Sequence, residues 1–350
     1  MALMHLYAVI DAQKQARLSV LGVDQREVRC IAAGNFAAVV GGAPLPNYRD
    51  IDRKQAIRYL LAHQCVVETV MRDHRVLPVK FGTILPDEHS VGRLLLQGTD
   101  IFRTALAGLQ SKIQMEIMAL WNMDTVLAEV ARHDSVVRFK SAAATATKAV
   151  GIEDQVALGK IVCALIEARR VSLKDSIACR LCEAACDIIV NPNIDESMVV
   201  NLALLVEDNA RDLLDSRLRE LDTEFDGKLN FRCVGPLPPY SFATVEVQVP
   251  TFEEVDEARR LLGLGERHNR DEIKQSYRRL ARQIHPDVDP DNSEADGLIS
   301  ELAGGYRLLM AYADSVNGDC GSDEPVVCCF DRQTVERTLI IALRRQESRD

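Results

Sequence analysis

The sequence predicts an α+β protein with two ferredoxin-like α+β units joined by helices, followed by a separate all-helical module. Residues 5–121 alternate strand and helix patterns around one hairpin, and residues 197–249 repeat such a mixture. Residues 255–313 instead contain three amphipathic helical patterns. We predict an N-terminal α+β domain at 1–133 and a helical segment with a second α+β domain at 134–250. A helical domain at 251–316 and a C-terminal tail at 317–350 follow.

Composition limits the classes of function. The chain has 350 residues, 47% of them hydrophobic and 27% charged, which is typical of a globular protein with more than one domain. Its net charge of −10 argues against nucleic acid as a partner. No apolar run approaches the roughly 20 residues of a membrane span, and the N-terminus lacks the basic region of a signal peptide. We therefore expect a soluble cytoplasmic protein that does not bind membranes.

The first unit is predicted from its hydrophobic periodicity. Gly34-Asn35 separates two apolar runs and indicates a hairpin. Asp52 is a predicted N-cap, and the helix after it has a core stripe of Ile57, Leu60, Leu61, Val67 and Val70. The predicted elements are strands at 5–10, 28–33 and 36–40, a helix at 52–73, a strand at 76–85, a helix at 90–109 and a strand at 113–121 that closes the unit.

The segment VLPVKFGTIL follows a helix that carries His63. This arrangement resembles the gas vesicle protein L/F family (GvpL/GvpF), in which a motif of the form VLPxRFGT follows a histidine-bearing helix. Lys80 stands where that family usually has arginine, and the matching residues are Lys80, Phe81, Gly82 and Thr83. A second interpretation is an edge strand with a solvated lysine, in which Gly82 marks a bulge and His63 is a hydrogen-bonded core residue.

Residues 134–190 contain no strand pattern and are predicted as helices, including 152–170 and 173–189. Cys179, Cys182 and Cys186 fall at helical spacing, and we expect them to be buried, reduced and metal-free core residues. The alternative is a metal or redox site, but no further cysteine or histidine follows at ligand spacing. The ten cysteines are scattered and suit a reducing compartment.

The second α+β unit carries another motif. Its predicted elements are a strand at 199–206, a helix at 209–225 and strands at 229–234 and 244–249. The loop between the last two strands resembles the GPWPPYSF hallmark of the same family, with Leu237 in place of tryptophan. Its matching residues are Gly235, Pro236, Pro238, Pro239, Tyr240, Ser241 and Phe242. Three prolines predict a rigid, extended loop with an aromatic tip. The GvpL/GvpF resemblance spans about residues 6–249.

The helical module contains the tripeptide His285-Pro286-Asp287 between two amphipathic helices. Pro286 ends the second helix and exposes its neighbours on a loop. This resembles the J-domain of the DnaJ family, in which the tripeptide and a basic second helix act on a DnaK-type chaperone. The corresponding basic residues are Lys274, Arg278, Arg279 and Arg282. A merely solvated charged face is the alternative, and Gly304-Gly305 departs from the family pattern because glycine weakens a helix.

The tail is predicted to contain a short strand at 326–330 and a helix at 334–345. No Walker loop, GxGxxG or Ser/His/Asp motif is present, so we expect neither an enzyme nor a cofactor. The two resemblances imply a minor gas vesicle component that binds the hydrophobic shell protein and other vesicle proteins and recruits a DnaK-type chaperone. The alternatives are a general co-chaperone with unrelated clients and a thiol- or metal-dependent enzyme using Cys179, Cys182 and Cys186.

Overall fold

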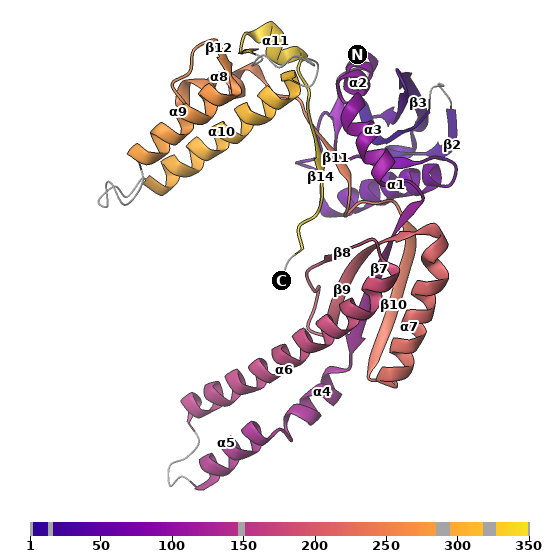
Figure 1. The fold of residues 1–350 in the computed structure, drawn as a ribbon, viewed down its shortest axis with the longest axis vertical. Coiled ribbons are helices and arrows are strands. Elements are labelled where there is room, and N and C mark those ends of the chain that lie inside the picture. The colour runs from indigo at the N-terminus through magenta and orange to yellow at the C-terminus, as the bar shows by residue number, and fades with distance from the viewer. Residues whose placement is uncertain (1–2, 13–16, 146–150, 285–294, 318–326, 349–350) are drawn as a thin grey trace. The chain divides into compact units, whose positions relative to one another are not determined.

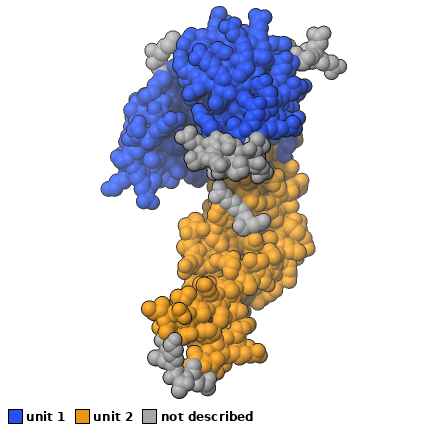
Figure 2. All heavy atoms as spheres, turned by 90° about the vertical axis from the view of Figure 1, so that its left-hand side faces the viewer, with its two compact units in different colours: residues 1–108, 244–344 blue, residues 109–243, 345–350 orange. Residues whose placement is uncertain are grey.

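The computed structural model describes residues 3–12, 17–145, 151–284, 295–317 and 327–348. The chain divides into two compact units (Figure 2), each built from two separate stretches of sequence. The first combines residues 1–108 with 244–344, and the second combines residues 109–243 with 345–350. Both contain strands and helices, and a helical region lies near the C-terminus, so the predicted α+β class is confirmed.

An antiparallel sheet forms the centre of the first unit (Figure 1). Its order is β2-β3-β4-β1-β5, and β6 also pairs with β1. β1 is buried along its whole length because strands flank it on both sides. The predicted hairpin joins β3 to β4, with Ala33 opposite Phe36 and Gly34 at φ 62°. The strands are β1 (Met4–Ile10), β2 (Arg17–Leu21), β3 (Glu27–Ala33), β4 (Phe36–Gly42), β5 (Val76–Pro78) and β6 (Ile84–Leu85).

Among the described residues, three helices accompany this sheet, and two predictions about them are wrong. The single helix predicted at 90–109 is divided at Gly98, where a Cβ atom would lie 2.4 Å from the Phe102 ring. In the first helix, Val67 and Val70 are buried as predicted, but Ile57, Leu60 and Leu61 are exposed, because the inward face is formed by the side of the helix that carries His63. Asp52 caps that helix as predicted. The helices are α1 (Arg53–Met71), α2 (Glu88–Gln97) and α3 (Thr99–Gly108).

A second antiparallel sheet, of order β10-β7-β9-β8, organises the second unit. The prediction that residues 113–121 close the first unit is wrong, because β7 pairs with β9 and β10 and buries Ile117 and Ala119 in this second core. β8 was predicted as helix, but its β-branched residues pair with β9. The strands are β7 (Lys112–Trp121), β8 (Asp187–Val190), β9 (Met198–Glu207) and β10 (Leu229–Leu237).

In the part of the second unit that the structure describes, four helices are present. The predicted division near residues 170–173 is absent, because no glycine or proline interrupts the helix there, and α6 continues to Leu181. The helix predicted at 209–225 is present as α7, in which Leu214 and Leu221 are buried while Leu213 is 40% exposed. The helices are α4 (Met123–Val130), α5 (Asp134–Thr145), α6 (Ile152–Leu181) and α7 (Arg211–Phe225).

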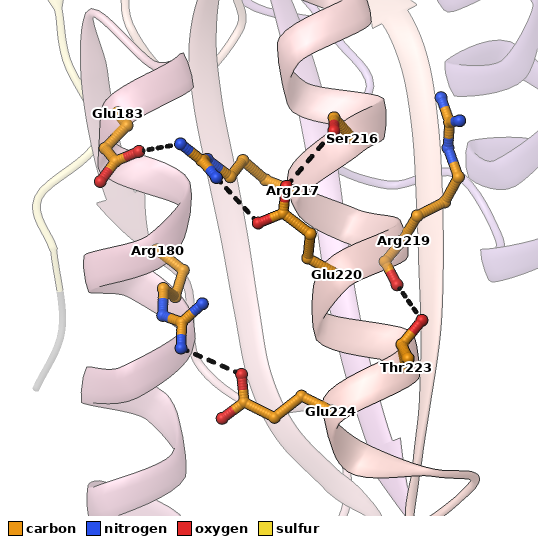
Figure 3. Close-up of polar contacts among 8 residues, drawn as sticks. All are labelled: Arg180, Glu183, Ser216, Arg217, Arg219, Glu220, Thr223 and Glu224. Carbon is orange, nitrogen blue, oxygen red and sulfur yellow. Dashed lines mark hydrogen bonds and ion pairs between the residues drawn. The ribbon is translucent and has the colours of Figure 1, made fainter.

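Ion pairs join the end of α6 to α7 (Figure 3). Arg180 on α6 contacts Glu224 at 3.1 Å. Arg217 on α7 contacts Glu183, in the 3-10 turn after α6, at 2.5 Å, and Glu220 at 2.8 Å. These pairs are partly exposed, so each one contributes little to stability by itself.

The three predicted helices of the module are present. The module is not all-helical or separate as predicted, because it contains the strand β12 and groups with the first unit. Its helices share a core that includes Val255, Ile273 and Leu309. Capping boxes at Thr251 and Asn269 begin the first two helices. The two-stranded sheet of β12 and β13 lies beside them. The elements are α8 (Phe252–Leu261), β12 (Arg267–Asn269), α9 (Arg270–Gln283), α10 (Ala295–Asn317) and β13 (Val327–Cys329).

The strands before and after the module pair with each other. The strand predicted at 244–249 was assigned to the second α+β unit. It is present as β11 (Thr244–Gln248), but it belongs to the first unit and pairs with β14 (Ile340–Arg344). The helix predicted at 334–345 is therefore wrong. Only α11 (Arg332–Arg337) is helical, and the β-branched pair Ile340-Ile341 continues as a strand. The strands that precede and follow the module therefore form one two-stranded antiparallel ribbon, so the module is attached at both of its ends.

Candidate functional site

The VLPVKFGT segment does not form the single strand predicted at 76–85. β5 and β6 both pair with β1, and a turn at residues 80–83 separates them. Gly82 has φ 86°, which favours glycine, and the Thr83 hydroxyl donates to the Lys80 carbonyl at 2.8 Å. Of the motif side chains, Phe81 lies beside His63 of α1.

A buried histidine pair lies under this turn. The Nε2 atom of His5 on β1 is 2.9 Å from the Nδ1 atom of His63 on α1. His63 Nε2 is 3.1 Å from the carbonyl oxygen of Val79, and His5 Nδ1 is 3.0 Å from the Tyr48 hydroxyl. The Phe81 ring centroid lies 5.6 Å from that of His63. The second interpretation of His63, as a hydrogen-bonded core residue, is therefore confirmed.

The hydrogen bonds determine which nitrogen carries each proton. The Val79 carbonyl only accepts, so His63 Nε2 donates and, in a neutral ring, His63 Nδ1 accepts from His5 Nε2. His5 Nδ1 then accepts from the Tyr48 hydroxyl. Burial lowers the pKa of His5 to about 3, with a smaller contribution from His63, and burial lowers the pKa of His63 to about 4. Both rings are therefore neutral at pH 7, and all their nitrogens are used internally.

Lys80 connects the motif to the ribbon that carries the helical module. Its backbone nitrogen donates to the Val245 carbonyl at 2.9 Å, and its Nζ atom lies 2.8 Å from Glu246. Glu246 also contacts Arg344 on β14 at 3.0 Å. Lys80 is thus not merely solvated, although its side chain is 60% exposed. Nothing in the sequence indicated Glu246 as its partner, because the two residues are far apart in the chain.

The Gly-Pro-rich motif packs against the second sheet and does not extend from it. Gly235 and Pro236 belong to the end of β10, and the peptide bond between them is cis. Pro238 and Pro239 are buried. Ser241 donates its backbone N–H to the Gln114 side chain at 2.9 Å, and Phe242 packs with Ile189, Ala203 and Leu205. The expected protruding aromatic tip is therefore wrong for Phe242, while Tyr240 is half-buried.

The basic face of α9 is present on the surface of the module. Arg278, Arg279 and Arg282 are exposed and Lys274 is half-buried. Lys274 lies 3.6 Å from Asp271, whereas Arg278 and Arg282 form no ion pair with any residue that the structure describes. Tyr277 on the same helix stacks on Tyr306 of α10, with ring centroids 4.2 Å apart. His285, Pro286 and Asp287 lie outside the described residues.

The prediction that the cysteine cluster is buried is wrong. Cys179, Cys182 and Cys186 are all exposed, because α6 ends at Leu181 and the chain turns there into β8. Across the described ranges, no group of three or more histidine, cysteine, aspartate or glutamate residues has the arrangement of a metal site. No helix in the described part of the chain is long and apolar enough to cross a membrane.

Comparison with known proteins identifies the region that contains both motifs. A family model described as "Gas vesicle synthesis protein GvpL/GvpF" matches residues 3–244. The chain belongs to the GvpL/GvpF family. Gas vesicle protein F of Streptomyces sp. (strain CB03234) is 30% identical over 224 residues, which cover 63% of this chain and 90% of that protein. Gas vesicle protein F of Dolichospermum flosaquae is 22% identical over 246 residues, covering 69% and 98%.

Solved structures show that the fold is that of GvpF. The crystal structure of GvpF from Anabaena sp. PCC7120 matches with a TM-score of 0.59 and 22% identity, over 69% of this chain and 98% of that one. The structure from Microcystis aeruginosa matches with a TM-score of 0.56 and 20% identity over the same shares. These relatives are described as gas vesicle proteins.

The helical module has a separate match. A model described as "DnaJ domain" covers residues 259–314. Chaperone protein DnaJ of Prosthecochloris aestuarii (strain DSM 271 / SK 413) is 47% identical over 49 residues, which are 14% of this chain but only 12% of that chaperone. This GvpL/GvpF chain therefore carries a DnaJ-like module, and the match spans only a small part of that chaperone.

Proposed function

We propose that this protein assists gas vesicle assembly and is a minor vesicle component, binding the hydrophobic shell protein and other vesicle proteins. Its DnaJ-like module recruits a DnaK-type chaperone, which keeps shell subunits from aggregating before they assemble. The protein acts in the cytoplasm and associates with gas vesicles. The main support for this proposal is that one chain combines a GvpL/GvpF region at 3–244 with a DnaJ-like module at 259–314.

The electrostatics of α9 support chaperone recruitment. Arg278 and Arg282 are one helical turn apart and exposed. Inside a chain of net charge −10, such a local basic face suits an acidic surface, because complementary charge raises the association rate and fixes orientation. His285, Pro286 and Asp287 are the proposed trigger for ATP hydrolysis by the partner.

The closed attachment of the module supports coupling between its two tasks. β11 and β14 pair along five residues, so the module is held at both ends. A chaperone bound to the module remains close to any shell subunit bound to the same chain. Binding then becomes effectively intramolecular, which raises the local concentration of chaperone at the client.

Two measurements test this proposal. The first is binding of the host's shell protein to the purified protein, with residues 251–339 replaced by a short Gly-Ser linker as a comparison. The second is ATP hydrolysis by the host's DnaK-type chaperone with and without the protein. The proposal expects shell-protein binding in both forms and ATPase stimulation by the full chain alone. A chain that stimulates the ATPase but does not bind the shell protein would instead support a general co-chaperone with other clients.

A further inference from the structure

The outer side of α1 carries three large apolar side chains that the fold leaves in solvent. Ile57, Leu60 and Leu61 are 49%, 48% and 59% exposed. They stand at positions i, i+3 and i+4, so they are neighbours on the helix surface. We call these three residues the outer stripe. Single exposed apolar residues are ordinary, but a contiguous group on one helix face is typical of an interaction surface.

The fold of the first unit does not need the outer stripe. α1 is already anchored through its other side, where Tyr59, His63, Val66, Val67 and Val70 are buried. Helices that only cover a sheet usually have one apolar side and one polar side. α1 is apolar on both sides, and its second apolar side faces solvent.

Three basic residues border the outer stripe. Arg53 lies in one i, i+4 row with Ile57 and Leu61, and Lys54 and Arg58 form the neighbouring row. All three basic side chains are exposed, and none forms an ion pair within the described ranges of the chain. The outer stripe is therefore an apolar surface with an unneutralised positive border.

The position of these charges is unfavourable for the helix itself. Arg53 and Lys54 lie in the first turn of α1, where no acidic residue is present. The positive end of the helix dipole is at this terminus, so basic side chains here destabilise the helix. By contrast, α2 and α8 have glutamate in their first turns. The N-cap carboxylate of Asp52 offsets part of this effect. The remaining positive charge of Arg53 and Lys54 does not favour the helix, and it suits an anionic partner.

We infer that the outer stripe and Arg53, Lys54 and Arg58 form a docking surface for an amphipathic helix of a partner protein. The partner helix presents an apolar stripe with carboxylate side chains beside it. Its apolar residues pack between Ile57, Leu60 and Leu61, as ridges of one helix fill grooves of another. Its carboxylates meet the basic border, which sets the direction of docking. We identify this partner as the gas vesicle shell protein, and this identification rests on the proposed function.

The experiment measures binding of the host's shell protein to the full chain and to two variants. The apolar variant is I57Q/L61Q, and glutamine keeps the helix because its helix propensity is at least that of isoleucine. The charge variant is R53E/K54E, which places acidic residues at the favourable end of the dipole and is therefore at least as stable as the wild type. We expect each variant to bind roughly tenfold more weakly or worse. The difference in affinity between the wild type and the charge variant should become smaller at high salt, because salt screens the charges and weakens wild-type binding.

A matched control is L127Q/V156Q. Leu127 and Val156 are 42% and 51% exposed on helices of the second unit, so this variant removes a similar apolar area elsewhere. It should bind like the wild type, and circular dichroism should show all variants folded. If wild-type protein binds the shell protein and the α1 variants bind equally well, this inference fails while the proposed function stands. If wild-type protein does not bind it, both fail.

A membrane surface is the competing occupant for a basic, apolar helix face. Vesicles containing phosphatidylglycerol and phosphatidylcholine serve as the probe for this alternative. Under the inference, wild-type protein does not sediment with these vesicles at physiological ionic strength. The opposite result would be that wild-type protein sediments with the vesicles, while I57Q/L61Q does not sediment but still binds the shell protein as the wild type does. That result would overturn the inference and identify the surface as a binding site for anionic lipid.

Discussion

His5 and His63 share one hydrogen bond of 2.9 Å in the interior of the first unit, and both rings are at least nine-tenths buried. The bond joins the first strand to the first helix, and His63 continues it to the carbonyl of Val79 at the start of the VLPVKFGT turn. Three segments that are distant in the sequence are therefore fixed by two neutral imidazoles. Every ring nitrogen already donates or accepts a hydrogen bond, so protonating either ring would break one of these bonds. Acid should therefore disrupt this arrangement.

The first prediction is acid sensitivity of the first unit. Both histidines have a folded-state pKa below the usual 6.5, about 3 for His5 and about 4 for His63, so the unfolded chain binds protons more readily. Their contribution to stability is complete above pH 6.5 and is lost progressively as the pH falls, toward 4 for His63 and toward 3 for His5. At pH 5 the loss is about 2 kcal/mol for each histidine, at 1.36 kcal/mol per pH unit. Denaturant unfolding between pH 7.5 and pH 5 measures it.

The variant H5Q separates this effect from general acid destabilisation. Glutamine retains an amide donor for His63 but does not titrate, so the dependence of stability on pH should become shallower. The control is H89Q, at an exposed histidine, which should keep the wild-type pH dependence. An unchanged slope in H5Q would contradict the assignment of the acid sensitivity to the histidine pair.

The second prediction concerns α10. Gly304 lies inside this helix, and a Cβ atom built there meets nothing within 4 Å. Replacing it with alanine should raise the free energy of unfolding by about 1 kcal/mol, because alanine has the higher helix propensity. The midpoint of urea unfolding, followed by helix signal, checks this. G82A is the opposite case, since Gly82 has φ 86° and alanine there should destabilise the protein.

Local patterns predicted much of this fold, and tertiary contacts account for the exceptions. The hairpin at Gly34-Asn35, the Asp52 cap and the three helices of the module depend on neighbours in sequence and are confirmed. By contrast, the strand at 113–121 joins the second sheet, and Thr244–Gln248 pairs with Ile340–Arg344. Periodicity identifies a strand but carries no information about its partner, which long-range packing decides.

The candidate sites show the same division. The two gas vesicle motifs were found from their residues, yet their roles depend on partners that the sequence does not indicate, such as Glu246 for Lys80 and Gln114 for Ser241. The core stripe of α1 was misassigned because apolar residues occur on both of its sides. Helical spacing alone does not say which apolar side faces the sheet. The domain boundaries and the roles of His285 and Asp287 remain predictions.

The third prediction tests the close packing around Gly235. A Cβ atom at this position would lie 2.5 Å from Met115 Sδ and 3.0 Å from the Gln114 carbonyl oxygen, and φ is 150°. G235A should therefore destabilise the second unit by roughly 2 kcal/mol, since both the clash and the conformation oppose a side chain. Thermal unfolding measures it. G227A is a useful comparison, because Gly227 also has positive φ but a Cβ atom there meets nothing within 4 Å.

The last prediction concerns the DnaJ-like module. Reversal of two exposed charges on α9, in R278E/R282E, should weaken stimulation of the host's DnaK-type ATPase. The loss should be largest at low salt, where exposed charges act over longer distances. Exposed substitutions of this kind usually change stability by less than about 0.5 kcal/mol, so the module should remain folded. D287N and H285Q should abolish stimulation at all salt concentrations, because they alter the proposed trigger and leave the charged docking face intact.

The control for this experiment is R219E/R232E, which changes the net charge equally at two exposed positions of the second unit. It should stimulate the ATPase like the wild type. Equal losses in R219E/R232E and R278E/R282E would show that overall charge, not the face of α9, governs the interaction. Failure of the wild-type protein to stimulate any DnaK-type chaperone of its host would remove the trigger role of His285 and Asp287. The module would then be a docking element, while membership of the GvpL/GvpF family, which depends on residues 3–244, would be unaffected.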